Sequence, residues 1–303
     1  MIKNHDSRDN TMNILFIGIG KMGLPMSTHL KNAGHIVKVR DLNPEQVKLA
    51  QLIGIEESSS DEDFNWADWI ISSMPNDDAF RSIAKVISEK SNSNAKYIDT
   101  STISIAASAY AANLLGEKNI SYLRVAVSGN NHMAQAAKLT VLSSGPSGLY
   151  EDAKNLLSCW GEKIYYLGEQ EQARLMKLVV NLMIAQTSAM LAEGLTLGRL
   201  GNLDWQDMWE VITNSAVGSP IMKAKMVQLG QPMGERDFSP TFTVEQMIKD
   251  LSLISQAGKD FGAPLVQTEQ TLDWMYQSVN EGDGQLDYAA IIRLLERKAG
   301  LSN

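Results

Sequence analysis

Hydrophobic and polar positions divide the chain into two parts with different periodicities. From residue 13 to about residue 167, short apolar runs alternate with segments in which apolar residues recur at helical spacing. The runs have the continuous apolar character of strands buried on both faces of a parallel sheet. They are NILFIGIG, IVKV, WIISSMP, AKYIDTS, SYLRVAV, LTVLSSG and KIYYLG. Strands alternating with helices predict an α/β fold with a doubly wound parallel sheet.

The strand-like runs stop near residue 169. From there to the end of the chain the periodicity predicts only helices, at 169–200, 204–213, 219–229, 243–261, 264–280 and 286–299. We therefore expect a sheet domain at 13–168 and an all-helical domain at 169–303, with the first long helix lining the cleft between them. The polar residues 1–12 are expected to form a disordered extension.

Composition narrows the class of protein. Among 303 residues, 27 are basic and 35 acidic, so the net charge of -8 argues against binding to nucleic acid. Cys159 is the single cysteine, which excludes an internal disulfide and favours a reducing, cytoplasmic setting. The four histidines form no metal-ligand spacing, so no metal site is expected. Lys177 and Asn181 interrupt the longest apolar stretch, so we expect no membrane span.

A glycine-rich loop follows the first predicted strand. It reads GIGKMG, with Gly18, Gly20 and Gly23 at the spacing G-x-G-x-x-G, Lys21 and Met22 between the last two, and a helix directly after. The first glycine permits a tight turn, the second lets a pyrophosphate approach the backbone, and the third lets helix and strand pack closely. The helix N-terminus then offers unpaired N–H groups to the phosphates. This context predicts a dinucleotide-binding Rossmann domain rather than a tight turn without a ligand.

An acidic residue ends the second predicted strand. Asp41 lies 23 positions after Gly18, about where an acid accepts hydrogen bonds from the ribose hydroxyls of NAD. A carboxylate there repels a 2′-phosphate, so Asp41 predicts NAD rather than NADP. Arg40 next to it could bind such a phosphate, but alternating strand geometry directs the two side chains to opposite sides.

A second candidate site lies in the stretch ARLMKLVVNLMIAQTSAML at 173–191, which is predicted to be a buried helix. Lys177 and Asn181 are four residues apart and share one face of that helix. Oxidation of a hydroxyl needs a base for the O–H proton, and the reverse reaction needs an acid, and a lysine can serve both roles. The alternative is a lysine whose stem lies along the core while its ammonium reaches water.

Several segments resemble signatures of one enzyme family. FIGIGKMGLPMSTHL is similar to the N-terminal signature of the β-hydroxyacid dehydrogenases, the group that contains 3-hydroxyisobutyrate dehydrogenase and tartronate semialdehyde reductase. Further segments resemble that family in the same order along the chain: DTSTIS, VSG, LMKLVVN, FSPTFTVEQMIKDLSL and GDGQLDYAA. The resemblance implies an NAD(P)-dependent 3-hydroxy acid dehydrogenase or semialdehyde reductase. It also implies a helical domain that binds substrate and forms a homodimer or homotetramer.

The resemblance assigns roles to individual residues. Lys177 would be the general acid/base, and Asn181 would hold its side chain in place. The substrate carboxylate would bind in the loop formed by Ser128, Gly129 and Asn130. The remaining dinucleotide contacts would come from Met74, Pro75, Thr102 and Lys249.

The segment RVAVSGNNHM departs from the family pattern. Arg124 and Ala126 stand where the family has an acid and a proline, and Asn130 replaces a second glycine. The family pattern does not explain His132, which we interpret as an exposed loop residue. The alternative is that Asn130, Asn131 and His132 reshape the pocket for a larger or more polar substrate.

Three alternatives stay open at this point. The first is an NADPH-dependent glyoxylate or succinic semialdehyde reductase, which Asp41 disfavours. The second is an imine reductase, which Lys177 disfavours. The third is a dinucleotide-binding protein without catalytic activity.

Overall fold

The computed structural model describes residues 11–301. Of the extension predicted at 1–12, residues 1–10 lie outside the described part of the chain. The chain divides into two compact units, Met1–Lys177 and Leu178–Asn303, and the long helix α8 (Gln172–Leu200) begins in the first unit and continues in the second.

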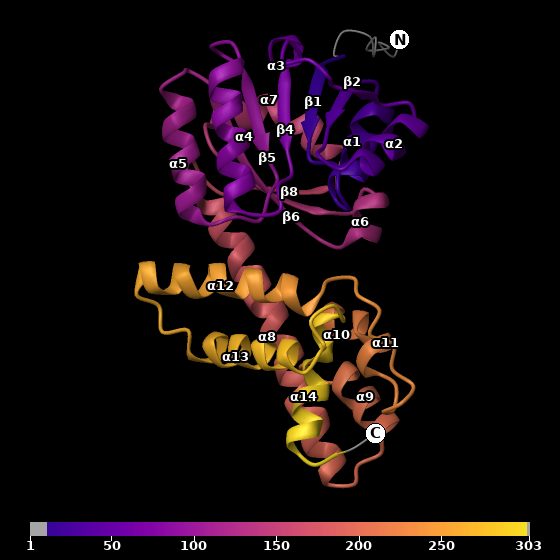
Figure 1. Cartoon of the computed structure of the whole chain (residues 1–303). Helices are drawn as coiled ribbons and strands as arrows, with labels where there is room; N and C mark the ends of the chain where they lie inside the picture. The colour runs from indigo at the N-terminus through magenta and orange to yellow at the C-terminus, as the bar shows by residue number, and fades with distance from the viewer. Residues whose placement is uncertain (1–10, 302–303) are drawn as a thin grey trace, which may run out of the picture. The chain divides into compact units, whose positions relative to one another are not determined.

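The first unit contains one sheet of eight strands in the order β3-β2-β1-β4-β5-β6-β7-β8 (Figure 1). Each of the seven predicted apolar runs contains a strand. The strands are β1 (Asn13–Ile17), β2 (Ile36–Arg40), β3 (Glu56–Glu57), β4 (Trp69–Ser72), β5 (Lys96–Asp99), β6 (Ser121–Ser128), β7 (Thr140–Ser144) and β8 (Lys163–Tyr166). The sequence pattern missed β3, because two exposed glutamates at a sheet edge carry no apolar signal.

The predicted doubly wound sheet is confirmed, with one correction. β6 and β7 pair antiparallel, whereas the other neighbouring strands pair parallel. The connection between β6 and β7 holds only the short helix α6 (Asn131–Gln135). A parallel pair needs a crossover of about a dozen residues or more, usually with a full helix, so this connection is suited to a reversal of direction.

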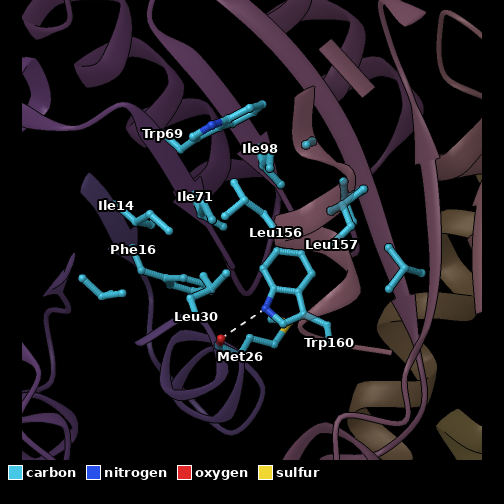
Figure 2. Packing of buried hydrophobic residues seen from close by; sticks show 14 of the residues in the cluster. Ile14, Phe16, Met26, Leu30, Trp69, Ile71, Ile98, Leu156, Leu157 and Trp160 are labelled. Atoms are coloured by element: carbon cyan, nitrogen blue, oxygen red, sulfur yellow. Dashed lines mark hydrogen bonds between the residues drawn. The ribbon is translucent and has the colours of Figure 1, made fainter. Parts of the chain in front are cut away.

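Helices cover both faces of the sheet. One face packs against α1 (Gly23–Asn32), α2 (Pro44–Leu52), α6 and α7 (Ser147–Ser158). The other face packs against α3 (Asp63–Trp66), α4 (Asp77–Lys90) and α5 (Ile105–Gly116). Figure 2 shows the first of these cores, where the indole of Trp160 is fully buried and donates a hydrogen bond of 3.1 Å to the Met26 carbonyl. This bond satisfies the one polar atom of a large apolar side chain and ties α1 to the segment after α7.

The second unit is helical over its described residues, as predicted. After α8 it contains α9 (Trp205–Asn214), α10 (Pro220–Ala224), α11 (Met226–Leu229), α12 (Val244–Phe261), α13 (Val266–Asn280), the 3₁₀ helix η1 (Tyr288–Ala290) and α14 (Ile291–Lys298). The helix predicted at 219–229 is broken at Lys225. The buried Lys225 ammonium lies 2.6 Å from the Asp287 carboxylate and 3.8 Å from the ring centre of Tyr288. This ion pair ties the break to η1.

The helix α8 is less buried than its apolar sequence predicted. Met176, Val179 and Met183 are 40%, 39% and 63% exposed, and Lys177 is partly exposed. Among the described residues, α8 is the one helix whose length and composition would allow it to cross a membrane, despite Lys177 and Asn181, and 39% of its apolar window is buried. A core helix of a globular domain passes the same test, so composition alone does not separate the two cases.

Candidate functional site

Four neighbouring parallel strands bring several of the predicted site residues to one edge of the sheet. β1, β4, β5 and β6 lie side by side and run parallel, so their carboxyl ends share that edge. The predicted positions at or just after these ends are Gly18, Met74, Pro75, Thr102, Ser128 and Gly129. In a doubly wound sheet this edge is where ligands bind.

The glycine loop fits a bound dinucleotide. Gly18 has a φ of +83°, and a Cβ there would lie 2.4 Å from the Ser73 carbonyl oxygen. A Cβ at Gly23 would lie 2.1 Å from the carbonyl oxygen of Gly18, so α1 packs against the loop only without a side chain at residue 23. A Cβ at Gly20 would meet no atom within 4 Å. The space beside Gly20 is therefore open to a pyrophosphate at the N-terminus of α1, where the helix dipole favours negative charge.

Asp41 and Arg40 point to different surroundings, as the strand alternation predicted. The Asp41 carboxylate accepts hydrogen bonds from the N–H groups of Ile19, at 2.7 Å, and Asn43, at 2.8 Å. Arg40 donates to the Ser60 carbonyl at 2.9 Å and to the Asp61 carboxylate at 3.1 Å. The carboxylate thus touches the glycine loop itself, whereas the guanidinium is held by the segment that follows β3.

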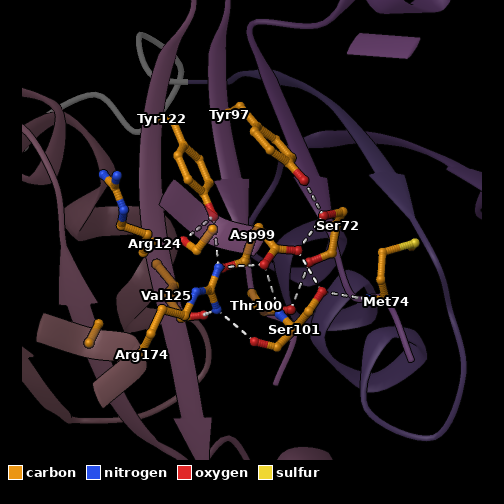
Figure 3. Close-up of polar contacts among 12 residues, drawn as sticks. Ser72, Met74, Tyr97, Asp99, Thr100, Ser101, Tyr122, Arg124, Val125 and Arg174 are labelled. Atoms are coloured by element: carbon orange, nitrogen blue, oxygen red, sulfur yellow. Dashed lines mark hydrogen bonds and ion pairs between the residues drawn. The ribbon is translucent and has the colours of Figure 1, made fainter. Parts of the chain in front are cut away.

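A buried polar network joins the loops after β4 and β5 (Figure 3). The Ser101 hydroxyl accepts a hydrogen bond of 2.6 Å from the Met74 N–H and donates one of 2.5 Å to the Asp99 carboxylate. Asp99 also accepts a 2.6 Å bond from Ser72 and forms an ion pair with Arg174. Met74, a predicted cofactor residue, is therefore held to the loop that carries Thr102.

The substrate loop predicted at Ser128, Gly129 and Asn130 leads directly into α6. Gly129 has a φ of +143°, and a Cβ there would lie 2.8 Å from Leu139. The side-chain oxygen of Asn130 caps α6 by accepting the Met133 N–H at 3.0 Å. Much of the Asn130 side chain is thus committed to the helix, and its contact with substrate stays a prediction.

The helix α6 is attached to the glycine loop at one point and to α1 at another. The Asn131 side chain donates a hydrogen bond to the Lys21 carbonyl, inside the glycine loop. His29 on α1 makes a contact of 2.9 Å through Nε2 with the Ala134 carbonyl. His132 is exposed on α6. The unusual sequence NNHM therefore forms a docked helix rather than an open loop.

The departures at Arg124 and Ala126 lie inside β6. Arg124 forms an ion pair with Glu171 at 2.6 Å and stacks on the Tyr122 ring at 4.7 Å. Ala126 is buried against Leu142 and Ala173. Both residues therefore take part in the packing of β6 against its neighbours.

Lys177 and Asn181 lie one turn apart on α8, as predicted. The amide nitrogen of Asn181 donates a 2.5 Å hydrogen bond to Asp250 of α12, and both side chains are buried. The neighbouring Lys249 forms an ion pair of 3.3 Å with Asp250. The proposed contact of Lys249 with the nicotinamide stays a prediction.

Sequence reasoning missed two residues of this region, Arg174 and Asn131 as an anchor. Arg174 lies in the same quoted stretch as Lys177, and a charged residue one turn before the lysine in an apolar helix was an available signal. Asn131 offered no such signal, because its partner is a backbone carbonyl 110 residues away in the chain.

Comparisons with known proteins agree with this geometry. Residues 13–168 match the family described as the NAD binding domain of 6-phosphogluconate dehydrogenase. Residues 172–295 match the NAD-binding family of NADP-dependent 3-hydroxyisobutyrate dehydrogenase.

Individual relatives match along nearly the whole chain. The chain is 29% identical to 2-(hydroxymethyl)glutarate dehydrogenase of Eubacterium barkeri, over 97% of this chain and 98% of that protein. It is 28% identical to glyoxylate/succinic semialdehyde reductase 2 of Arabidopsis thaliana, over 94% of this chain and 80% of that protein. The structure of Mycobacterium tuberculosis 3-hydroxyisobutyrate dehydrogenase with L-serine superposes with a TM-score of 0.86 at 26% identity, over 94% of this chain and 99% of that one.

The glycine loop with Asp41, the segments at the carboxyl ends of β4, β5 and β6, and the helix that carries Lys177 are thus matched by sequence families over both parts of the chain. The chain belongs to the β-hydroxyacid dehydrogenase family and is a pyridine-nucleotide-dependent oxidoreductase.

Proposed function

We propose that the protein interconverts a small 3-hydroxy acid and the matching semialdehyde with NAD, using Lys177 as general acid/base. The placement of α8 is the observation that carries this proposal. The Arg174 guanidinium bonds to the Ser101 carbonyl at 2.6 Å and the Val125 carbonyl at 3.2 Å, near the ends of β5 and β6. Lys177 lies three residues later on the same helix, and these contacts of Arg174 support a place for it near the strand end that carries Ser128.

Asp41 and Arg40 support NAD rather than NADP. The Asp41 carboxylate is positioned on the glycine loop, where it suits ribose hydroxyls and repels a 2′-phosphate. Arg40 is engaged by Ser60 and Asp61, so its charge is directed elsewhere.

In this proposal Lys177 transfers the proton to and from the substrate oxygen. Bound NAD supplies the hydride acceptor, and in the reverse direction NADH supplies the hydride. In the oxidation direction the neutral Lys177 amine takes the hydroxyl proton, and in the reduction direction the ammonium returns a proton to the forming alkoxide. Asp250 fixes the amide of Asn181 with its nitrogen toward α12. This orientation presents the amide oxygen as the acceptor for the lysine one turn earlier on α8.

The substrate carboxylate is assigned to the loop at the end of β6. Ser128 offers a hydroxyl and Gly129 an N–H group, and both lie at the ligand-binding edge of the sheet. A carboxylate held by such donors gains charge-assisted hydrogen bonds. The docked helix α6 closes this loop and sets the space for the rest of the substrate.

An exposed apolar stripe on α8 supports a homo-oligomer, either a dimer or a tetramer. Met183, Met190 and Leu197 are 63%, 50% and 72% exposed and recur every seven residues on one face. Such a stripe is suited to burial against a second copy of the chain. Light scattering coupled to size exclusion checks this proposal, and a monomer at micromolar concentration would contradict it.

The function is tested by a spectrophotometric screen at 340 nm with NAD and NADP. The panel contains 3-hydroxyisobutyrate, 2-(hydroxymethyl)glutarate and L-serine for oxidation, and succinic semialdehyde, glyoxylate and a cyclic imine for reduction. Turnover of a 3-hydroxy acid with NAD supports the proposal. Turnover of glyoxylate or succinic semialdehyde with NADPH alone would favour the reductase named among the relatives. Cofactor binding without turnover of any member would favour a non-catalytic role.

A further inference from the structure

Arg174 is a fully buried arginine one turn before Lys177 on α8, with a relative exposure of 1%. We propose that Arg174 is a positioning residue that ties the first turn of α8 to the backbone of the cofactor and substrate loops. The inference rests on the proposed function of Lys177. It adds the reason why a lysine on a partly exposed helix keeps a fixed place relative to those loops.

The guanidinium reaches two neighbouring strands at once (Figure 3). Nη1 donates to the carbonyls of Ser101, at 2.6 Å, and Val125, at 3.2 Å. Nη2 donates to the Asp99 carbonyl at 3.2 Å, to the Asp99 carboxylate, and to the Tyr122 hydroxyl at 3.0 Å. One side chain of α8 therefore holds the end of β5, the loop after it, and the β6 segment that leads to Ser128.

The network extends from Asp99 to a third loop. The Asp99 carboxylate accepts from the hydroxyls of Ser72 and Ser101, at 2.6 and 2.5 Å. The Ser101 hydroxyl in turn accepts the Met74 N–H at 2.6 Å. The loop after β4, which contains the predicted cofactor residue Met74, is thus connected to α8 through Ser101 and Asp99.

The surroundings of Arg174 and of two tyrosines shift their pKa values in the direction that keeps Arg174 charged and the phenols neutral. Burial opposes the charge on Arg174, but the Tyr122 hydroxyl and the Asp99 carboxylate outweigh it and raise the pKa of the guanidinium. Burial also raises the pKa of Tyr97 and of Tyr122, so both phenols stay neutral. The Arg174–Asp99 ion pair is therefore buried inside a hydrogen-bonded frame.

The Arg174 network fixes the position of the first turn of α8 rather than adding stability to the fold. A buried ion pair contributes little stability beyond that of well-packed apolar side chains, because desolvation offsets the attraction. A planar guanidinium, however, directs its donors along fixed and separate directions. A lysine at residue 174 would keep the charge and the pairing with Asp99, but its single nitrogen cannot also span the Ser101 and Val125 carbonyls. The substitution Arg174→Lys thus keeps the positive charge at this site but removes the hydrogen bonds that hold the two loops.

The test compares Arg174→Lys with a matched control, Arg236→Lys. The Arg236 side chain is also buried, with 3% exposure, and forms a forked ion pair with Glu296 at 3.0 and 2.9 Å. Arg236 lies in the second unit and donates otherwise to the Gln231 carbonyl. With 3-hydroxyisobutyrate as substrate, Arg174→Lys is expected to lower kcat by about 10- to 100-fold, the size of a misplaced reacting group. The Kd for NAD should rise by a smaller factor than kcat falls, because the pyrophosphate site in the glycine loop is untouched. The primary deuterium isotope effect on kcat should rise.

Hydrogen–deuterium exchange supplies a readout that needs no substrate. In Arg174→Lys, amides of residues 99–104 and 172–180 should exchange faster than in the wild type, and in Arg236→Lys they should not. If Arg174→Lys does not fold, the pair Arg174→Gln with Asp99→Asn removes both buried charges and takes its place in the same measurements.

Each outcome decides the proposal. Unchanged exchange at 99–104 in a folded Arg174 variant would overturn it, and so would an equal loss of kcat in both lysine variants, which would indicate a purely structural role. If the wild type turns over no substrate of the panel, the proposed function fails. The exchange comparison then still decides whether Arg174 positions these loops.

Discussion

Replacement of Asp41 by asparagine should reverse the cofactor preference. The side chain is partly buried and accepts hydrogen bonds from the Ile19 and Asn43 N–H groups at 2.7 and 2.8 Å. An asparagine of the same size retains one acceptor oxygen and loses the charge. The loss of charge-assisted hydrogen bonds to the ribose should weaken the binding of NAD by about 1.5 kcal/mol, or about tenfold in Kd.

The same change removes a repulsion from NADP. Two unit charges about 4 Å apart in a water-like environment interact by about 1 kcal/mol, and a phosphate carries close to two charges. Affinity for NADP should therefore rise by about 2 kcal/mol, or about 30-fold. The ratio of the two dissociation constants should shift by about 300-fold in total.

Isothermal titration of both cofactors measures this ratio without any substrate. Arg40→Ala is the control, because the Arg40 guanidinium is held by Ser60 and Asp61. In this variant the ratio of the NAD and NADP dissociation constants should change by less than about threefold. A ratio for Asp41→Asn within about threefold of the wild type would refute the role of the carboxylate. A large loss of NADP affinity in Arg40→Ala would identify the guanidinium as the phosphate ligand instead.

Four further substitutions test the glycine loop, α6 and the turn after α6. Gly23→Ala should lower the free energy of unfolding in urea by about 2 kcal/mol, since its Cβ would lie 2.1 Å from the Gly18 carbonyl oxygen. Gly20→Ala should leave the free energy of unfolding nearly unchanged and raise the Kd for NAD measured by titration. Equal stability of the Gly23→Ala and Gly20→Ala variants would contradict the expected difference between the two glycines. Asn131→Ala removes the bond to the Lys21 carbonyl and should raise the Kd for NAD about threefold, so an unchanged Kd would show that the anchor does not shape the loop. Ala137 has a φ of +52°, so Ala137→Gly should stabilise the protein by about 0.5 to 1 kcal/mol, and a lower unfolding midpoint would contradict the strain.

Local patterns were sufficient to predict most of the fold. The apolar runs located seven strands, because strands buried on both faces need continuous apolar sequence. The direction of β7 depends on the length and docking of the connection from β6, and neither is a periodic property. The break at Lys225 depends on a buried carboxylate 62 residues later in the chain.

Some residues of the candidate site could likewise be predicted from local patterns, and others could not. Gly18, Gly20, Gly23 and Asp41 follow from spacing, since a short βαβ unit fixes their geometry locally. Arg174 acts through partners 49 to 75 residues away in the chain. No spacing rule predicts contacts of that kind, which arise only when the strand ends assemble. The apolar character of α8 also misled the prediction of its burial, because composition does not distinguish a core helix from one with an exposed apolar stripe.

Turnover and NAD binding by Lys177→Ala, measured side by side at 340 nm and by titration, test the central claim most directly. Loss of a general acid/base should lower kcat for 3-hydroxyisobutyrate by about 100-fold or more. The Kd for NAD should stay within about threefold of the wild-type value, because Lys177 lies outside the glycine loop. A variant that binds NAD and retains near-wild-type kcat would contradict the assignment of Lys177 as the group that moves the proton.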